Sequence, residues 1–298
     1  MALLGIRTSS LRPDEALGFD VYLLISGKHL LYVKRSDVIA GERLDRLQLK
    51  NVRQLFITDE DKPLYEEFLR GGAQAALSAS DVPLAGRARV IAGQSKAAVE
   101  EMFVHPQLRE NYERARSAAA NQVAFLLKQP EALEPILAMA KFDRTVYQHS
   151  VNVASIAVGL AAGLGAPLDT ISALGLGGLL HDLGKSPAAT STGVADWRQH
   201  PRAGAGLLLN RDYVSRDVLD LILLHEERLD GRGYPAGAKK LDQIFQVMGL
   251  ANFYDRLVTI EGRDPRAAYD EIEGMNPLPY ERDLIHGLKD VLVANKIC

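Results

Sequence analysis

Four histidines in the carboxyl-terminal two thirds of this chain have neighbours suited to metal or phosphate chemistry. His181 precedes Asp182 in the segment HDLGK, after the apolar run GLGGLL. A carboxylate can bridge two cations while the adjacent imidazole binds one of them. Lys185, within one turn, offers a point charge suited to a phosphate. A histidine at a helix end with a capping aspartate would explain the same dipeptide without a metal.

In two further segments a histidine has neighbours that suit a metal site. His200 stands before a proline, where either a metal ligand or a plain helix-entry turn fits. His225 opens the segment HEE, and the loop DGRGYP follows at residues 230–235. The backbone conformation of a loop explains the glycines and the Tyr-Pro pair, but it does not explain the charged residues that precede the loop. His149 begins a helical segment, and three histidines without such neighbours are interpreted as structural or surface residues: His29, His105 and His286.

A helical region must position these segments. Helix formers and 3.6-residue spacing predict helices at residues 94–103, 107–128, 130–141, 149–164, 168–181, 201–209, 215–225, 241–259, 265–272 and 280–293. The glycines at 175, 177 and 178 do not form a dinucleotide-binding loop, because no strand precedes them and the third glycine of that motif is missing. Close helix packing is the expected use.

The amino-terminal part has a different pattern. Two β-prone runs within residues 20–34 flank Gly27-Lys28 and predict a hairpin, and residues 52–58 predict another strand. Residues 42–50 allow a short helix, and residues 59–70 predict a longer one. We therefore expect an α+β protein, with an α/β module over 1–75, a linker over 76–95 and an all-α domain over 96–298. The small, polar, glycine-containing run at 71–93 suggests the linker.

Composition limits the possible functions. The chain has 298 residues, 35 Lys and Arg against 38 Asp and Glu, and a formal charge of -3, so a general nucleic-acid binder is not expected. One cysteine, Cys298, excludes a disulfide framework and a thiolate cluster. No stretch reaches the roughly 18 apolar residues of a membrane span, and no signal-peptide core is recognised. We expect a cytoplasmic protein with no membrane partner.

Taken in order, the segments HS, HDLGK, HP and HEERLDGRGYP resemble the HD-GYP family, a bacterial branch of the HD phosphohydrolases. The resemblance covers roughly residues 100–290. It implies a helical bundle with two or three metal ions, often iron or manganese, and hydrolysis of cyclic di-GMP in signal transduction through a metal-bound hydroxide. Independently, two cations roughly 3.5–4 Å apart suit this slow reaction of an anionic phosphodiester, because they neutralise charge and lower the pKa of water.

The resemblance also implies roles for individual residues. The implied metal ligands are His149, His181, Asp182, His200 and His225. Lys185 would meet a substrate phosphate, as would Arg263 and Arg266 once a short insertion is allowed in the alignment. Gly233, Tyr234 and Pro235 would shape the substrate face or a docking face for a diguanylate cyclase.

Three positions depart from the family pattern. Glu226 stands where a second histidine is usual, and a glutamate can still bind a hard cation. Asn252 stands where a late helix usually supplies an aspartate, so it keeps a carbonyl oxygen without the charge. Thr145 replaces a glutamate that some members use for a third metal, so we expect two metals.

These departures leave competing functions open. The first hypothesis is a metal-dependent cyclic di-GMP phosphodiesterase in which Asp182 and Lys185 take part in catalysis. The second is a degenerate domain that binds a nucleotide or a protein partner without turnover, as Glu226 and Asn252 would suggest. A third is a phosphohydrolase that acts on other nucleotides. Metal analysis beside a hydrolysis assay would separate them.

Overall fold

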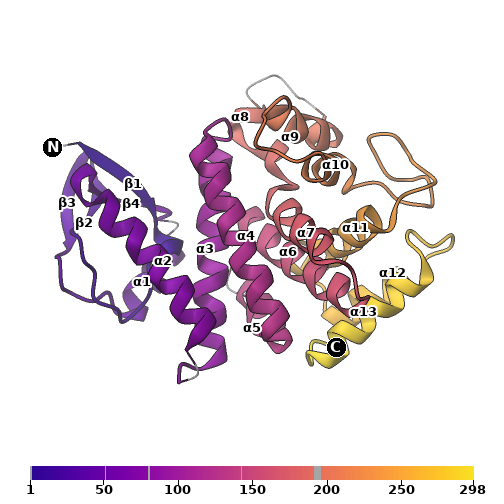
Figure 1. Ribbon diagram of the computed structural model, residues 1–298, viewed down its shortest axis with the longest axis horizontal. Helices are drawn as coiled ribbons and strands as arrows, with labels where there is room; N and C mark the ends of the chain where they lie inside the picture. Colours follow the sequence, from indigo (N-terminus) through magenta and orange to yellow (C-terminus); the bar gives the residue numbers. More distant parts are fainter. Residues whose placement is uncertain (1, 51, 80, 142, 191–195) are drawn as a thin grey trace. The chain divides into compact units, whose positions relative to one another are not determined.

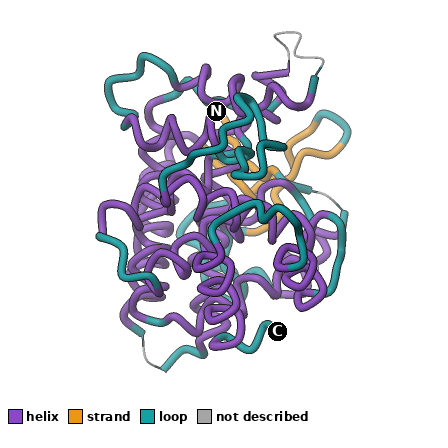
Figure 2. Tube along the Cα trace, turned by 90° about the vertical axis from the view of Figure 1, so that its right-hand side faces the viewer, coloured by secondary structure: helices purple, strands orange, loops and turns teal. Residues whose placement is uncertain are grey.

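The computed structural model describes residues 2–50, 52–79, 81–141, 143–190 and 196–298. Contacts between residues divide the chain into two compact units, Met1–Ala97 and Ala98–Cys298. The strands gather in one small sheet, and most of the remaining chain is helical (Figure 2). The predicted fold class, a small sheet-containing module followed by an all-helical domain, is confirmed.

The first unit is built on a four-stranded antiparallel sheet. The spatial order of the strands is β1 (Leu3–Arg7), β4 (Gln54–Thr58), β2 (Val21–Ile25) and β3 (Lys28–Val33). The predicted hairpin is present, and its turn residues Ser26 and Gly27 have φ angles of 51° and 78°, as tight hairpin turns require. Strand β1 was not predicted, because its five residues are fixed by pairing with the distant β4.

The helices of this unit cover a compact apolar core. They are α1 (Gly41–Leu49), α2 (Lys62–Ser78) and the start of α3 (Leu84–Val104), which continues into the second unit. Phe19, Leu55 and Ile57 are fully buried between these elements. Helices α2 and α3 occupy most of the segment 76–95, which the sequence predicts to be a linker. Its alanines favour helix more strongly than its glycines oppose it.

The second unit contains helices throughout. Those that follow α3 are α4 (Arg109–Lys128), α5 (Leu133–Ala138), α6 (Val146–Gly163), α7 (Leu168–Leu180), α8 (Pro187–Thr190), α9 (His200–Leu208), α10 (Arg216–Leu224), α11 (Gln243–Asp255), α12 (Pro265–Glu273) and α13 (Arg282–Ala294). A π-helical turn, Arg256–Ile260, extends α11. Among the described residues, none of these helices combines the length and apolar character needed to cross a bilayer.

Helices α6 and α7 lie side by side and carry the first half of the site (Figure 1). Their close approach depends on glycine. A Cβ atom on Gly178 would lie 2.6 Å from the Cα of Ala154 in α6. Gly175 serves the packing of α7 against α4, where its Cβ would lie 2.7 Å from a methyl group of Val123. The predicted use of these glycines in close helix packing is therefore confirmed.

Candidate metal centre

The HD pair is delivered into the interior by α7. His181 follows the last residue of this apolar helix, and the side chains of His181 and Asp182 are 0% and 1% exposed. Gly184 lies in the next turn, where a Cβ would be only 1.8 Å from the carbonyl oxygen of His200. Glycine at this position therefore lets the first residue of α9 approach the HD pair.

The structure brings the four predicted histidines together around Asp182. One carboxylate oxygen, Oδ2, lies 3.8 Å from His149 Nε2 and 3.5 Å from His181 Nε2. The other, Oδ1, lies 3.2 Å from His200 Nε2 and 3.7 Å from His225 Nε2. Asp182 thus offers one oxygen to each of two histidine pairs, and each pair with Asp182 forms a group that could hold a metal ion.

The hydrogen bonds of the rings determine which nitrogen faces the centre. Nδ1 of His181, His200 and His225 each lies 2.8 Å from a backbone carbonyl oxygen. A carbonyl oxygen can only accept, so each Nδ1 carries the proton and each Nε2 of the neutral ring keeps its lone pair. His149 Nδ1 lies 2.7 Å from Asp255 Oδ2 and is oriented in the same way.

This arrangement leaves lone pairs facing one another. The Nε2 atoms of His149 and His181 are 3.3 Å apart, and those of His200 and His225 are 2.9 Å apart. Two unprotonated nitrogens cannot form a hydrogen bond, whereas both can bind one cation. Asp182 Oδ1 is also buried without a hydrogen-bond partner among the described residues. The residues therefore fit two divalent cations that share Asp182.

The surroundings of these groups keep them in the charge states that metal binding needs. Burial lowers the pKa of His181 to about 3. Burial, with His181 and His200 nearby, also lowers the pKa of His225 well below its ordinary value, so both rings stay neutral near pH 7. For Asp182, burial would raise the pKa, but the charge of Lys185, 2.7 Å away, outweighs it and holds the pKa well below the usual range. The carboxylate is therefore ionised.

The late helix α11 supplies the remaining contacts of the first histidine pair. Asn252 is buried, and its Oδ1 lies 3.1 Å from His149 Nε2. Sequence reasoning assigned no role to Asp255, which orients His149 and accepts hydrogen bonds from Asn152 and Thr259. Its position three residues after Asn252 on a helix was the available signal.

The two glutamates after His225 point to different places. Glu226 Oε1 lies 3.9 Å from His200 Nε2 and 3.7 Å from His225 Nε2, so its carboxylate borders the second histidine pair. Glu227 is completely buried, and its two oxygens accept the backbone N–H groups of Ala236 and Ala238. Glu227 therefore holds the segment after the DGRGYP loop, a role the sequence did not reveal.

The DGRGYP loop folds back over the second histidine pair. A Cβ on Gly233 would lie 2.3 Å from the backbone nitrogen of Arg228, so only glycine allows this return. The ring of Tyr234 lies 6.0 Å from that of His200, and burial followed by the charge of Glu226 raises its pKa, which keeps the phenol protonated. Pro235 follows through a cis peptide bond.

Two other residues singled out in the sequence are Lys185 at the rim of the centre and Thr145 at the start of α6. Lys185 Nζ is 2.7 Å from Asp182 Oδ2, and its side chain is 42% exposed, so it could also reach a ligand. Thr145 caps α6, because its side chain accepts a hydrogen bond from the backbone of Gln148. It offers a hydroxyl where a third metal would need a carboxylate.

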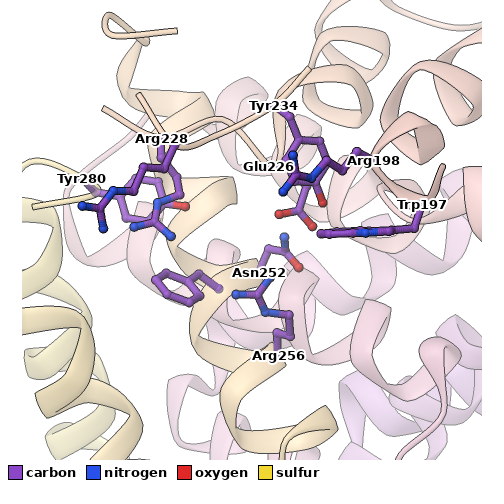
Figure 3. Close-up of a pocket in the computed structure, with 10 residues that line it drawn as sticks. Trp197, Arg198, Glu226, Arg228, Tyr234, Asn252, Arg256 and Tyr280 are labelled. Atoms are coloured by element: carbon purple, nitrogen blue, oxygen red, sulfur yellow. The ribbon is translucent and has the colours of Figure 1, made fainter. Parts of the chain in front are cut away.

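A cavity of about 160 Å³ opens beside the centre. Glu226 and Asn252 line it and also border the histidine pairs. In Figure 3, Arg228 and Tyr280 lie at one end, Trp197 and Arg198 at the other, and Glu226 and Asn252 between them. The complete lining also includes Arg232, Tyr234, Phe253 and Arg256. Sequence reasoning did not identify this aromatic and basic lining.

The two arginines predicted to bind substrate do not line this cavity. Arg263 pairs with Glu261 and Glu271, and Arg266 lies 2.9 Å from Asp270. The π-helical turn at Arg256–Ile260 precedes both residues and changes their register relative to α11. The arginines that line the cavity are Arg198, Arg228, Arg232 and Arg256, and substrate binding by Arg263 and Arg266 stays a prediction.

Comparisons with known proteins agree with this geometry. A family model of the HD domain matches residues 146–269. A similar solved structure is Bd1817, a HDG"Y"P protein from Bdellovibrio bacteriovorus, with 29% identity and a TM-score of 0.84 over 98% of this chain and 100% of that chain. Residues 146–269 therefore match an HD domain, and the chain is similar in sequence and fold to an HD-GYP-type protein.

Two curated proteins are also similar. The cyclic di-GMP phosphodiesterase PA4108 of Pseudomonas aeruginosa is 31% identical over 186 residues, which are 58% of this chain and 45% of that protein. The 3'3'-cGAMP-specific phosphodiesterase 1 of Vibrio cholerae is 28% identical over 163 residues, 50% of this chain and 37% of that protein. The chain thus spans less than half the length of these curated relatives.

Proposed function

We propose that this protein is a metal-dependent phosphodiesterase that hydrolyses cyclic di-GMP. The observation that carries the proposal is Asp182, whose two oxygens each face one pair of unprotonated histidine nitrogens. The names of the two curated relatives support a cyclic dinucleotide as the substrate. Iron and manganese suit a donor set of nitrogen and oxygen atoms without cysteine.

Different residues of the chain would bind the metals, contact the phosphate and cover the site. The four histidines and Asp182 would hold two divalent cations, with Glu226 and Asn252 beside them. Such a pair, when bound, supplies charge neutralisation at the phosphate and a lower pKa for water. Lys185 would contact a phosphate oxygen from the rim, and the DGRGYP loop would cover the second histidine pair. A diguanylate cyclase partner at this loop remains a prediction.

A specific observation favours one alternative, a binding module without turnover. Asn252 occupies its place beside His149 without a negative charge, and Glu226 replaces one neutral ligand by a charged one. Both changes lie at the proposed metal centre. A domain that retained the histidines for structure or ligand binding alone would tolerate them.

The test combines elemental analysis with a hydrolysis assay. The purified chain, supplied with iron(II) or manganese(II), should contain about two metal ions per chain and convert cyclic di-GMP to the linear dinucleotide or GMP, with 3'3'-cGAMP assayed in parallel. The double substitution His181→Ala and Asp182→Ala should abolish both properties. His286→Ala is the matched control, because His286 is 51% exposed and lies outside the cluster. A wild-type chain that takes up no metal would refute the proposal, and a metal-loaded chain without turnover would favour the binding module.

A further inference from the structure

Two arginines contact the same aromatic ring in the cavity beside the metal centre. The guanidinium carbons of Arg228 and Arg256 each lie 4.9 Å from the ring centre of Phe253. Both are cation–π contacts, and they hold two positive charges against a single ring. Both guanidinium groups are positively charged, so this arrangement favours an anion beside them.

The hydrogen-bonding capacity of these arginines is incompletely used. Arg228 contacts Asp230 and Met275, and Arg256 Nε lies 3.7 Å from Glu261. Nevertheless, the Nε atoms of both arginines are buried without a hydrogen-bond partner among the described residues. A buried donor without an acceptor is costly, and a phosphate group would supply acceptors in the planar geometry that guanidinium matches.

The charge of the whole cavity points the same way. Four arginines line it, against one carboxylate, that of Glu226. Glu226 also borders the second histidine pair, so its charge would face the metal centre, and the carboxylates that pair with Arg228 and Arg256 do not line the cavity. This excess of lining arginines favours a ligand that carries a negative charge in the cavity as well as one at the metal centre.

We infer that Arg228, Phe253 and Arg256 form a subsite for the second phosphate of a cyclic dinucleotide, the one that is not hydrolysed. A cyclic dinucleotide has two phosphodiester groups, and only one at a time can occupy the metal centre. The other phosphate needs its own counter-charge, which Arg228 and Arg256 supply. We call these two arginines and Phe253 the clamp. The inference rests on the proposed function, and it makes the cavity selective for substrates with two phosphates over those with one.

The same cavity contains a natural reporter of binding. Trp197 is the only tryptophan of the chain, lies at the end opposite Arg228 and is 62% exposed (Figure 3). Its ring meets that of Tyr234 at 5.3 Å. A nucleotide bound across the cavity would change the surroundings of this one indole, so its fluorescence can follow binding without any turnover.

The test compares Arg256→Gln and Arg228→Gln with the control Arg216→Gln. Arg216 is an exposed arginine on α10 that pairs with Asp220 and does not line the cavity. Each metal-loaded variant is assayed with cyclic di-GMP, which has two phosphates, and with bis(4-nitrophenyl) phosphate, which has one. Loss of one charge-assisted contact should raise KM for cyclic di-GMP by about tenfold or more. KM for the single-phosphate substrate should not change.

Two variants guard against a folding defect. Arg228 holds Asp230 in the DGRGYP loop, whereas Arg256 pairs only with the partly exposed Glu261, so Arg256→Gln is the cleaner change. Equal effects of Arg256→Gln on both substrates, or no effect on either, would overturn the subsite while the phosphodiesterase activity stands.

A second measurement separates the subsite from the proposed function. Cyclic di-GMP is titrated into chelator-treated protein, with Trp197 fluorescence and equilibrium dialysis as readouts. If the wild-type chain proves inactive, weaker binding in Arg256→Gln but not in Arg216→Gln would still support the clamp. Absent binding, or equal affinity in all variants, would refute it.

Discussion

At the scale of single residues, Asn252 is the position where the centre lacks a charge. Its Oδ1 and the Nε2 of His149 are both acceptors, yet they lie 3.1 Å apart. A cation between them would satisfy both, and a carboxylate would bind it more tightly than an amide because of the added Coulomb attraction. We predict that Asn252→Asp raises the metal content per chain and the rate of cyclic di-GMP hydrolysis, measured by elemental analysis and product formation.

The same substitution has the opposite effect if no metal is bound. The new carboxylate would then lie near Asp182 in a buried site, and two like charges without a cation should lower the melting temperature. Asn210→Asp is the control, since residue 210 is exposed and outside the centre. A variant that gains no metal and loses no stability would contradict the placement of Asn252 in the centre.

Lys185 is the second residue whose role can be tested directly. Its ammonium lies 2.7 Å from Asp182 Oδ2, but nearly half of its side chain is exposed, which leaves it accessible to a substrate. We predict that Lys185→Ala raises KM for cyclic di-GMP by about tenfold, as loss of a charged contact typically does, with unchanged metal content. Lys141→Ala, at an exposed position, is the control. If the metal content falls while KM for cyclic di-GMP is unchanged, Lys185 acts only as the partner of Asp182.

The sequence predicted the central residues and missed those around them. His149, His181, Asp182, His200 and His225 lie in ordered motif segments, and the structure brings all five together. Asp255, Glu227 and the clamp arginines could not be predicted in the same way, because their roles arise from contacts between distant segments. A one-dimensional alignment also could not foresee the π-helical turn that precedes Arg263 and Arg266, or that Arg256 lines the cavity.

At the scale of elements, the packing of α7 against α6 determines where the HD pair lies. A Cβ on Gly178 would lie 2.6 Å and 2.8 Å from backbone atoms of Ala154, which cannot move without shifting α6. We predict that Gly178→Ala destabilises the helical unit by about 1–3 kcal/mol, the usual cost of overpacking. Urea unfolding would measure it.

Gly206 provides the matched control in another helix. It lies in α9, and a Cβ there would meet nothing within 4 Å. Gly206→Ala should therefore stabilise the chain by about 0.5–1 kcal/mol, because alanine loses less backbone freedom in a helix. Equal effects of the two substitutions would show that α6 and α7 do not pack through Gly178.

The elements themselves were predictable where the pattern is local. The hairpin of β2 and β3 follows from alternating β-prone runs around a turn, and the apolar stripe of α6 is evident in its sequence. Strand β1 and the helical character of residues 76–95 were not foreseen. The first depends on pairing with residues about fifty positions away, and the second on the balance of alanine against glycine.

At the scale of the whole molecule, metal binding should be linked to the stability of one unit only. All residues of the centre lie within Ala98–Cys298, and none lies in Met1–Ala97. A cation that binds only the folded state stabilises it by about 2.7 kcal/mol when the free cation concentration is about 100 times the dissociation constant. For a unit of about 200 residues, this corresponds to a rise in melting temperature of about 5–10 °C.

Thermal unfolding can detect this selectively. Trp197 is the only tryptophan and lies in the helical unit, so its fluorescence follows the melting of that unit alone. We predict that manganese raises this transition relative to chelator-treated protein and leaves any separate transition of the first unit unchanged in calorimetry. The double substitution His181→Ala and Asp182→Ala should abolish the rise, because it removes the shared carboxylate and one imidazole. An equal rise in that variant would mean that manganese stabilises the chain from another site, and the centre around Asp182 would have to be abandoned as its binding place.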